Sequence, residues 1–317
     1  MKKVFLYVLI STFMFSSMEI ALKSVQGVFS PIQLNLLRFF VGGLVLLPIV
    51  LRKKSPQMLT SKWKSIGIFM LTGFLCVVVS MTLYQMAIMY DQASTVAVLF
   101  SCNPVFALLF AFVILREKMS RLGFISLVIS IIGLLIIVNP ANLTNPLGLS
   151  LALGSALTFG LYSIVSRWGS QKTGFKGLAM TCYTFIAGSI ELLVLVGISN
   201  ISAVAKFMNS VEWLKPFAYT PALQNVSLHY FWILLFICVF VTGGGFAFYF
   251  LAMDHGGVSI ASLVFFIKPG LAPILAMITI GDKIALNTWC GIVVILIGSV
   301  ITFIGSRLEQ KNSELED

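Results

Sequence analysis

Residues 100–118, FSCNPVFALLFAFVILREK, and residues 265–283, FFIKPGLAPILAMITIGDK, are two nearly continuous apolar stretches. Each is close to the length of about 20 apolar residues that a helix needs to cross a bilayer. The rest of the chain has a similar composition, because 59% of its 317 residues are apolar and only 10% are charged. Soluble domains carry about 25% charged residues. The sequence therefore predicts an all-α membrane protein.

Ten stretches of this kind are expected to cross the membrane: 4–23, 31–51, 64–89, 93–115, 120–138, 146–167, 175–198, 229–252, 257–280 and 286–306. Most connectors are short. The exception, 199–228, suits an interfacial loop with a short helix near 203–214. The first stretch is expected to be a retained span and not a cleaved signal peptide. It runs to Lys23, contains Glu19 and lacks a small-x-small cleavage site.

Basic residues are distributed unevenly over the connectors. If the N-terminus lies in the cytoplasm, the outer connectors hold only Lys23, Lys206, Lys215 and Lys283. Most of the other basic residues then lie on the inner side, which matches the positive-inside bias of membrane proteins. We interpret the net charge of +10 as this topology signal and not as nucleic-acid binding. The expected location is the bacterial cytoplasmic membrane, with both termini in the cytoplasm.

The two quoted stretches belong to a longer internal repeat. Residues 84–138 match residues 249–303 without a gap, with Pro104 opposite Pro269 and Glu117-Lys118 opposite Asp282-Lys283. Residues 11–23 match residues 155–167 at a smaller shift, and the length of the 199–228 connector accounts for the difference. The predicted units are a first repeat (1–145), a second repeat (146–306, with 199–228 as an outer insertion) and a cytoplasmic tail (307–317).

Each repeat unit contains five spans. Because five is an odd number, the second copy is expected to be inverted across the membrane. The fold prediction is therefore ten transmembrane helices arranged as two inverted five-helix repeats. Inverted repeats are typical of secondary transporters, in which they surround a site near the middle of the bilayer. A membrane scaffold that arose by gene duplication remains the alternative.

Together these features resemble the EamA family of the drug/metabolite transporter superfamily. The residues that carry the resemblance are Leu36-Leu37-Arg38-Phe39 in the second span, Asn103-Pro104-Val105 through Arg116-Glu117-Lys118 in the fourth, and Gly133, Gly291 and Gly298. The resemblance implies a monomer or a weak dimer with a central cavity lined by spans 1, 3, 4, 6, 8 and 9. It also implies movement of small organic solutes across the membrane. The repeat is broken at one notable position, where Lys268 stands opposite Asn103.

Lys268 is the strongest candidate for a substrate-binding residue. A charge at the centre of a bilayer costs about 2.5–3.5 kcal/mol on insertion scales, so such a residue should face a cavity or a partner. Pro269 follows it and interrupts the helical hydrogen bonds. Lys268 would then neutralise a substrate carboxylate or phosphate. The alternative is a structural ion pair with Glu19 or Glu191.

Glu19 is the second candidate and lies toward the outer end of the first span. Phe15 is one turn before it on the same helical face. With Tyr84, Tyr162 and Tyr249, these residues could form an acid-bearing aromatic box for an ammonium group. The alternatives are neutralisation of Glu19 by Lys23, and aromatic side chains that only pack. Asn103 is included as the position opposite Lys268.

Five further residues are assigned structural roles: Arg38, Pro104, Pro269, Glu117 and Asp282. Arg38 is expected to bond carbonyl groups at the ends of spans, and substrate contact is its alternative. The scattered cysteines and the two isolated histidines form no metal-binding spacing, so no metal or cofactor is expected. The sequence has no HExxH, GxSxG or GxxxxGK[ST] motif, which argues against an enzyme and against direct use of ATP.

The sequence thus predicts a secondary active transporter that moves a small polar organic metabolite by alternating access. An amino acid or a related zwitterion suits a site with Glu19 and Lys268 separated along the membrane normal. The alternative is a multidrug-type exporter of organic cations, which Lys268 would disfavour. The expected partners are the small-molecule substrate and the lipid bilayer. An ion gradient, a proton gradient among the candidates, or a substrate gradient would supply the energy.

Overall fold

The computed structural model describes residues 2–52, 59–116, 121–139 and 145–316. In these ranges, ten helical stretches are long and apolar enough to cross a membrane: Lys2–Ser24, Pro31–Arg52, Lys62–Tyr90, Ala93–Ile114, Arg121–Val138, Pro146–Thr173, Gly177–Ser199, Leu228–Gly257, Leu263–Ile280 and Leu286–Gly305. They confirm the all-α membrane fold and the ten expected spans. Two ends differ clearly, because the sixth span extends to Thr173 and the ninth begins at Leu263. Gly257 has a φ of 79°, which interrupts the helix where the ninth span was expected to start.

The first five spans comprise α1 (Lys2–Ser16) with α2 (Met18–Ser24), α3 (Pro31–Arg52), α4 (Lys62–Gly73) with η1 (Phe74–Ser80) and α5 (Met81–Tyr90), α6 (Ala93–Phe100) with α7 (Asn103–Ile114), and α8 (Arg121–Val138). The last five comprise α9 (Pro146–Thr173), α10 (Gly177–Ser199), α12 (Phe231–Leu235) with η4 (Phe236–Gly244) and α13 (Gly245–Ala261), α14 (Leu263–Ile280) and α15 (Leu286–Glu316).

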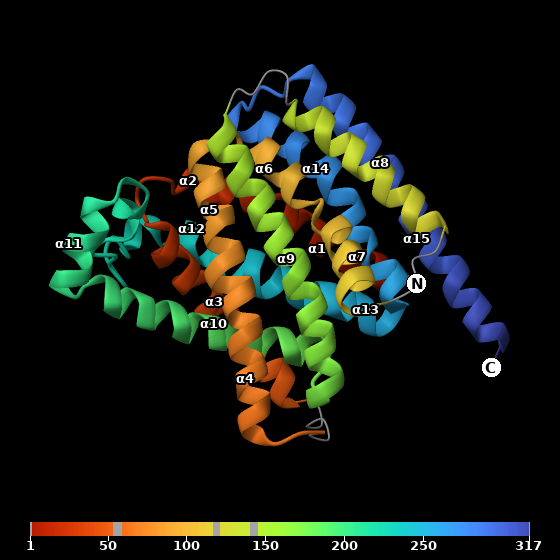
Figure 1. Cartoon of the computed structure of the whole chain (residues 1–317), viewed down its shortest axis with the longest axis horizontal. Coiled ribbons are helices and arrows are strands. Elements are labelled where there is room, and N and C mark those ends of the chain that lie inside the picture. The colour runs from red at the N-terminus through yellow and green to blue at the C-terminus, as the bar shows by residue number, and fades with distance from the viewer. Residues whose placement is uncertain (1, 53–58, 117–120, 140–144, 317) are drawn as a thin grey trace.

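The 199–228 connector forms a small layer of its own. It contains α11 (Ser202–Ser210) and the 3-10 turns η2 (Glu212–Phe217) and η3 (Leu228–Tyr230), close to the short helix expected near 203–214. Figure 1 shows this layer on the left, on the side of the molecule away from both chain ends. The Gln33 side chain donates to the carbonyl of Gln224 (2.6 Å), and the Asn225 side chain donates to the carbonyl of Val28 (2.7 Å). The connector is therefore fastened to the turn between α2 and α3.

Helix ends follow from local sequence. Pro146 lies in the first turn of α9, where its missing N–H costs nothing, and the Asn145 side chain accepts a hydrogen bond from the Gly148 N–H (3.1 Å). Gly174 ends the same helix in the left-handed conformation with a φ of 82°. This conformation is unfavourable for residues with a Cβ atom, so glycine is the natural helix terminator here.

Four spans are irregular near their middles. Ser17 separates α1 from α2, and Ser101-Cys102 separates α6 from α7. The third and eighth spans each contain a π-helical segment, η1 and η4. Such segments are rare and occur frequently at functional sites, because the wider turn re-aims side chains. In the eighth span, the Thr242 hydroxyl bonds the carbonyl of Ile237, five residues earlier (2.8 Å).

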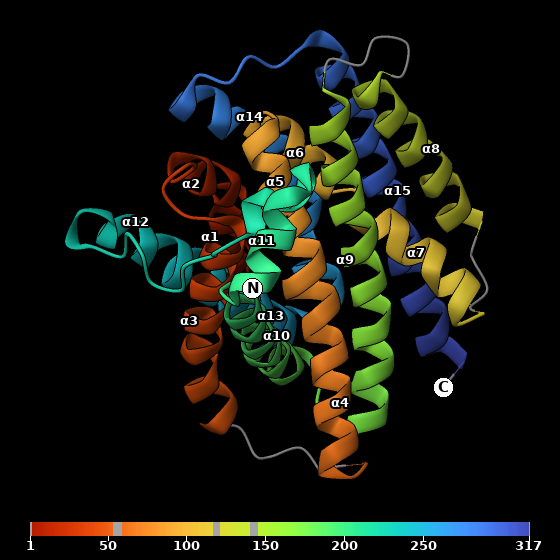
Figure 2. The same ribbon diagram turned by 60° about the vertical axis from the view of Figure 1, so that its left-hand side comes forward.

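Close helix packing depends on glycine, most clearly where α8 and α15 lie side by side along the outside of the bundle (Figures 1 and 2). A Cβ atom added at Gly291 would lie 2.3 Å from Ile137 Cγ1 and 2.7 Å from the Gly133 carbonyl oxygen. The Ser126 hydroxyl crosses the same interface to the carbonyl of Gly298 (2.8 Å). Small residues at these positions let the two backbones approach, as in other membrane helix pairs.

Candidate functional site

The irregular parts of the spans converge on a cavity of about 40 Å³ in the middle of the bundle. Its lining comes from the first, second, third, fourth, sixth, eighth and ninth spans: Phe15, Met18, Arg38, Phe39, Cys76, Met81, Phe100, Phe159, Val241, Thr242, Phe246, Phe265 and Lys268. All six spans expected to line a cavity contribute, and the second span joins them. The volume suits about three water molecules. An organic metabolite needs more room, so in this conformation the cavity is too small to hold one.

Lys268, which lines this cavity, belongs to a buried ion pair. Lys268 Nζ lies 2.8 Å from Glu19 Oε1, and the two side chains are only 4% and 1% exposed. The Tyr84 hydroxyl donates a second hydrogen bond to the same oxygen, Oε1. Lys268 Nζ also lies 5.3 Å from the centre of the Phe100 ring, a cation–π distance. Lys268 and Tyr84 thus both contact Glu19. The Lys268–Glu19 contact is the ion pair that was the alternative to substrate binding by Lys268, and the two charges are not separated along the membrane normal.

Arg38 is the second cation at the cavity. It is 1% exposed, and its guanidinium carbon lies 4.5 Å from the centre of the Phe39 ring. Its Nη2 points at the sulfur of Met81 (2.9 Å), while Nε and Nη1 have no hydrogen-bond partner in the described structure. The expected bonds from Arg38 to carbonyl groups at span ends are therefore not found among the described residues. Arg38 instead faces the middle of the bundle.

Aromatic rings separate the charged groups from the rest of the bundle. Phe15 packs against Phe246 (4.9 Å between ring centres) and lies nearly parallel to Phe265 (5.9 Å, 16°). Tyr249 packs edge-on against Phe265 (5.1 Å) but does not itself line the cavity. Phe15 is thus a wall residue, and Tyr249 supports the wall from behind.

The remaining sequence candidates lie at the periphery of the site. Tyr162 is buried and packs against Phe159, which lines the cavity (5.1 Å). The Asn103 side chain donates to the carbonyl of Phe100 (2.8 Å) and so bonds across the break between α6 and α7. Pro104 follows in the first turn of α7. Pro269 lies inside α14 directly after Lys268, where its ring removes a helical hydrogen bond to the carbonyl of Phe265.

Asp282 belongs to a cluster of polar contacts at the end of the bundle that holds the α5–α6 turn. Its Oδ2 accepts hydrogen bonds from the N–H and the hydroxyl of Ser94, both at 3.0 Å, at the start of α6. Lys23 Nζ donates to the carbonyls of Ile88 and Asp91, both at 2.7 Å, at the end of α5. Burial raises the pKa of the Asp91 carboxyl above its ordinary value, although the Gln92 N–H and Lys23 oppose the shift. Glu117, the counterpart of Asp282 in the repeat, lies outside the described residues.

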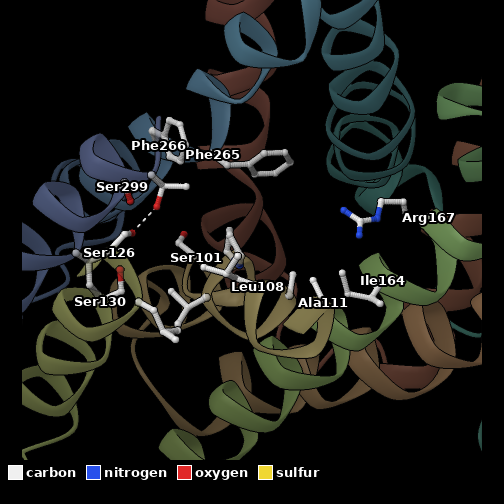
Figure 3. Close-up of a pocket in the computed structure, with 16 residues that line it drawn as sticks. Ser101, Leu108, Ala111, Ser126, Ser130, Ile164, Arg167, Phe265, Phe266 and Ser299 are labelled. Carbon is white, nitrogen blue, oxygen red and sulfur yellow. Dashed lines mark hydrogen bonds between the residues drawn. The ribbon is translucent and has the colours of Figure 1, made fainter. Parts of the chain in front are cut away.

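Figure 3 shows a second, larger cavity of about 240 Å³, which also has Phe265 in its lining. The hydroxyl groups of Ser101, Ser126, Ser130, Ser299 and Thr302 line it, and Arg167 stands on the opposite side near the end of α9. Phe265 lines both cavities. We call the larger one the vestibule, because it adjoins the central cavity at Phe265.

Sequence reasoning missed several of these lining residues. Phe100 and Phe265 are matched across the repeat, and that match was an available signal for a shared place in the site. Phe159 is matched to the candidate Phe15 across the repeat and could have been found in the same way. Met18, Cys76 and Thr242 were not singled out, because an apolar or small residue within a span faces lipid, protein or cavity with the same composition. The π-helical turns that re-aim Cys76 and Thr242 leave no pattern in the sequence.

The fold is that of a multi-pass membrane protein with a small internal cavity that two buried cations line. The chain matches the model of the EamA-like transporter family over residues 2–139 and 146–304. It belongs to this family, within the drug/metabolite transporters. The two matched stretches each contain five of the observed spans.

Individual relatives point the same way. An uncharacterized transporter of Clostridium kluyveri is 31% identical over 97% of this chain and 95% of its own length. The uncharacterized transporter YyaM of Bacillus subtilis is 22% identical, with 87% and 85% covered. One solved crystal structure shares the fold at a TM-score of 0.62 and 14% identity, with 95% of this chain and 96% of that chain covered. The protein is therefore a membrane transporter of the EamA family.

Proposed function

We propose that this protein is a secondary active transporter of a small carboxylate-bearing metabolite, with an amino acid or a related zwitterion as the leading substrate. The observation that carries the proposal is the Glu19–Lys268 ion pair beside the small central cavity. The pair is itself an internal zwitterion. A ligand that carries both a carboxylate and an ammonium group can offer each partner a replacement of the same charge when the pair separates.

The charges around the cavity argue against the alternative, an exporter of lipophilic cations. Lys268 and Arg38 both line the cavity, and Glu19 neutralises only one of them. An organic cation would enter a site that is already positive. A carboxylate would be attracted to it, and the attraction is strong because the interior has a low dielectric constant.

The arrangement of the cavities supports alternating access. Phe265 lines both the central cavity and the vestibule, so a movement of this ring would connect the two. The polar contacts of Lys23 and Asp282 would hold the opposite end of the bundle shut. We propose that the vestibule leads to the cytoplasm, with both termini on that side of a bacterial cytoplasmic membrane. Two inverted repeats, working as a monomer or weak dimer, would open the two sides in turn. A proton gradient is the first coupling gradient to test.

Flux into proteoliposomes tests the proposal. Purified protein is reconstituted, and uptake of labelled amino acids is compared with uptake of labelled organic cations, with and without an imposed pH gradient. We expect saturable uptake of at least one amino acid above protein-free vesicles, and no uptake of the cations. Acceleration by the pH gradient would assign proton coupling.

Uptake of cations alone would overturn the substrate assignment and support the exporter alternative. Uptake of labelled neutral sugars alone would also overturn the substrate assignment, because sugars give neither partner of the ion pair a replacement charge. Arg52→Met serves as a control for the variants described below, since it removes a positive charge from the exposed end of α3, away from the cavity.

A further inference from the structure

Arg38 is a buried cation with few partners. It lies within α3, is 1% exposed, and two of its guanidinium nitrogens have no acceptor among the described residues. Its third nitrogen contacts a thioether sulfur, which is a weak acceptor. Among the described residues, no carboxylate forms an ion pair with it. Lys268, in contrast, has Glu19.

A buried charge without a partner is unfavourable. Removing an ion from water costs several kcal/mol, which a protein recovers only when a counter-ion and hydrogen bonds replace the water. The Phe39 ring returns a part of this through a cation–π contact. Arg38 therefore lowers the stability of the folded protein, and a ligand that supplies the missing acceptors would recover this cost.

The position of Arg38 defines the chemistry of that ligand. It lines the same cavity as Lys268, and these two cations are the charged side chains in its described lining. A carboxylate that displaces the Met81 sulfur from Nη2 can bind two guanidinium nitrogens at once. Arginine and carboxylate match in this planar geometry, and the resulting hydrogen bonds are about twice as strong as neutral ones.

We propose that Arg38 is the substrate's carboxylate receptor, and that it makes the site selective for organic acids and amino acids over their amides and amines. This inference rests on the proposed function and specifies its binding chemistry. The Glu19–Lys268 pair then binds the remainder of the ligand, so that the carboxylate and the ammonium group are bound by different spans. Arg38 thus acts on the substrate directly.

The test measures binding of three matched ligands to purified protein: an amino acid that the wild type transports, its amide and its N-acetyl derivative. Arg38→Met and Arg38→Lys are compared with the wild type and with Arg52→Met. In Arg38→Met we expect the Kd of the amino acid and of the N-acetyl acid to rise about 10- to 100-fold, while the Kd of the amide stays within about threefold. Arg38→Lys should lie between, because it keeps the charge and loses the planar fork.

The ligand-free protein supplies a second readout. Arg38→Met should melt at the same temperature as the wild type or above it, since an unpartnered buried charge is removed. A structural arginine predicts a lower Tm and an unchanged ratio of acid to amide affinity, and that pair of results would overturn the proposal. If Arg38→Met does not fold, the ratio measured with Arg38→Lys decides in the same way.

The proposed function and the role of Arg38 can be contradicted by different results. A wild-type protein that binds neither the amino acid nor the N-acetyl acid contradicts the proposed function, and the role of Arg38 falls with it. A wild type that binds both, with an Arg38→Met variant that discriminates acid from amide equally well, contradicts only the assignment of Arg38.

Discussion

At the scale of single residues, the central question is why Glu19 and Lys268 are buried together. Their pairing at 2.8 Å removes most of the penalty that each charge alone would impose. Glu19 Oε2 remains without a partner in the described structure, and Tyr84 bonds only Oε1. The pair is therefore incompletely satisfied, which favours its opening when a ligand provides better partners.

The ion pair leads to a stability prediction. Lys268→Met should destabilise the protein by about 3–5 kcal/mol, because it leaves the Glu19 carboxylate buried beside Tyr84 alone. The double variant Glu19→Gln with Lys268→Met should recover most of this loss, since neither charge remains. Thermal unfolding in detergent, followed by tryptophan fluorescence, measures both. Equal destabilisation of the single and the double variant would show that Glu19 does not depend on Lys268.

The sequence shows where a charged residue lies along a span, but it does not show which way its side chain points. Lys268 stood out because a lysine in the middle of a span is expensive, and Glu19 was among its predicted partners. Arg38 was equally visible, yet it was assigned to the ends of spans. The face of a helix that meets the cavity depends on packing of the neighbouring spans, and hydropathy along one span does not contain that information.

At the scale of helices, glycine sets how closely spans approach. Gly291→Ala should destabilise the protein by about 1–3 kcal/mol, because the new Cβ atom would lie 2.3 Å from Ile137 Cγ1 and 2.7 Å from the Gly133 carbonyl oxygen. Gly197→Ala is the matched control, since nothing lies within 4 Å of its added Cβ atom. Denaturation in detergent compares the two variants. An unchanged stability of Gly291→Ala would mean that α8 and α15 are free to separate.

The irregular segments show the limit of sequence patterns at this scale. The break before Asn103-Pro104 has a local cause, because proline lacks an N–H and fits the first turn of a helix. The π-helical segments η1 and η4 have no such marker. Each replaces regular α-helical turns inside a continuous apolar run. The apolar run predicts the span, but it does not predict the π-helical segment within it. These two segments supply Cys76, Val241 and Thr242 to the cavity.

At the scale of the whole molecule, the sequence defined the number of spans and the family. Both follow from sums over many residues, which tolerate errors at single positions. The contacts between distant segments, such as Asp282 with Ser94 and Lys23 with Asp91, depend instead on a few individual side chains. No pairwise signal in one sequence reports those contacts. The inverted relation of the two repeats and the orientation in the membrane stay predictions.

The central claim is that substrate passes through the charged cavity around Glu19, Lys268 and Arg38. The most direct test is counterflow of a labelled amino acid in proteoliposomes, comparing the wild type with the Glu19→Gln, Lys268→Met double variant and with Arg52→Met. Tm values establish that all three proteins are folded. We predict exchange in the wild type and in Arg52→Met, and exchange at the level of protein-free vesicles in the double variant. If a folded double variant exchanges the labelled amino acid at the wild-type rate, the claim is contradicted.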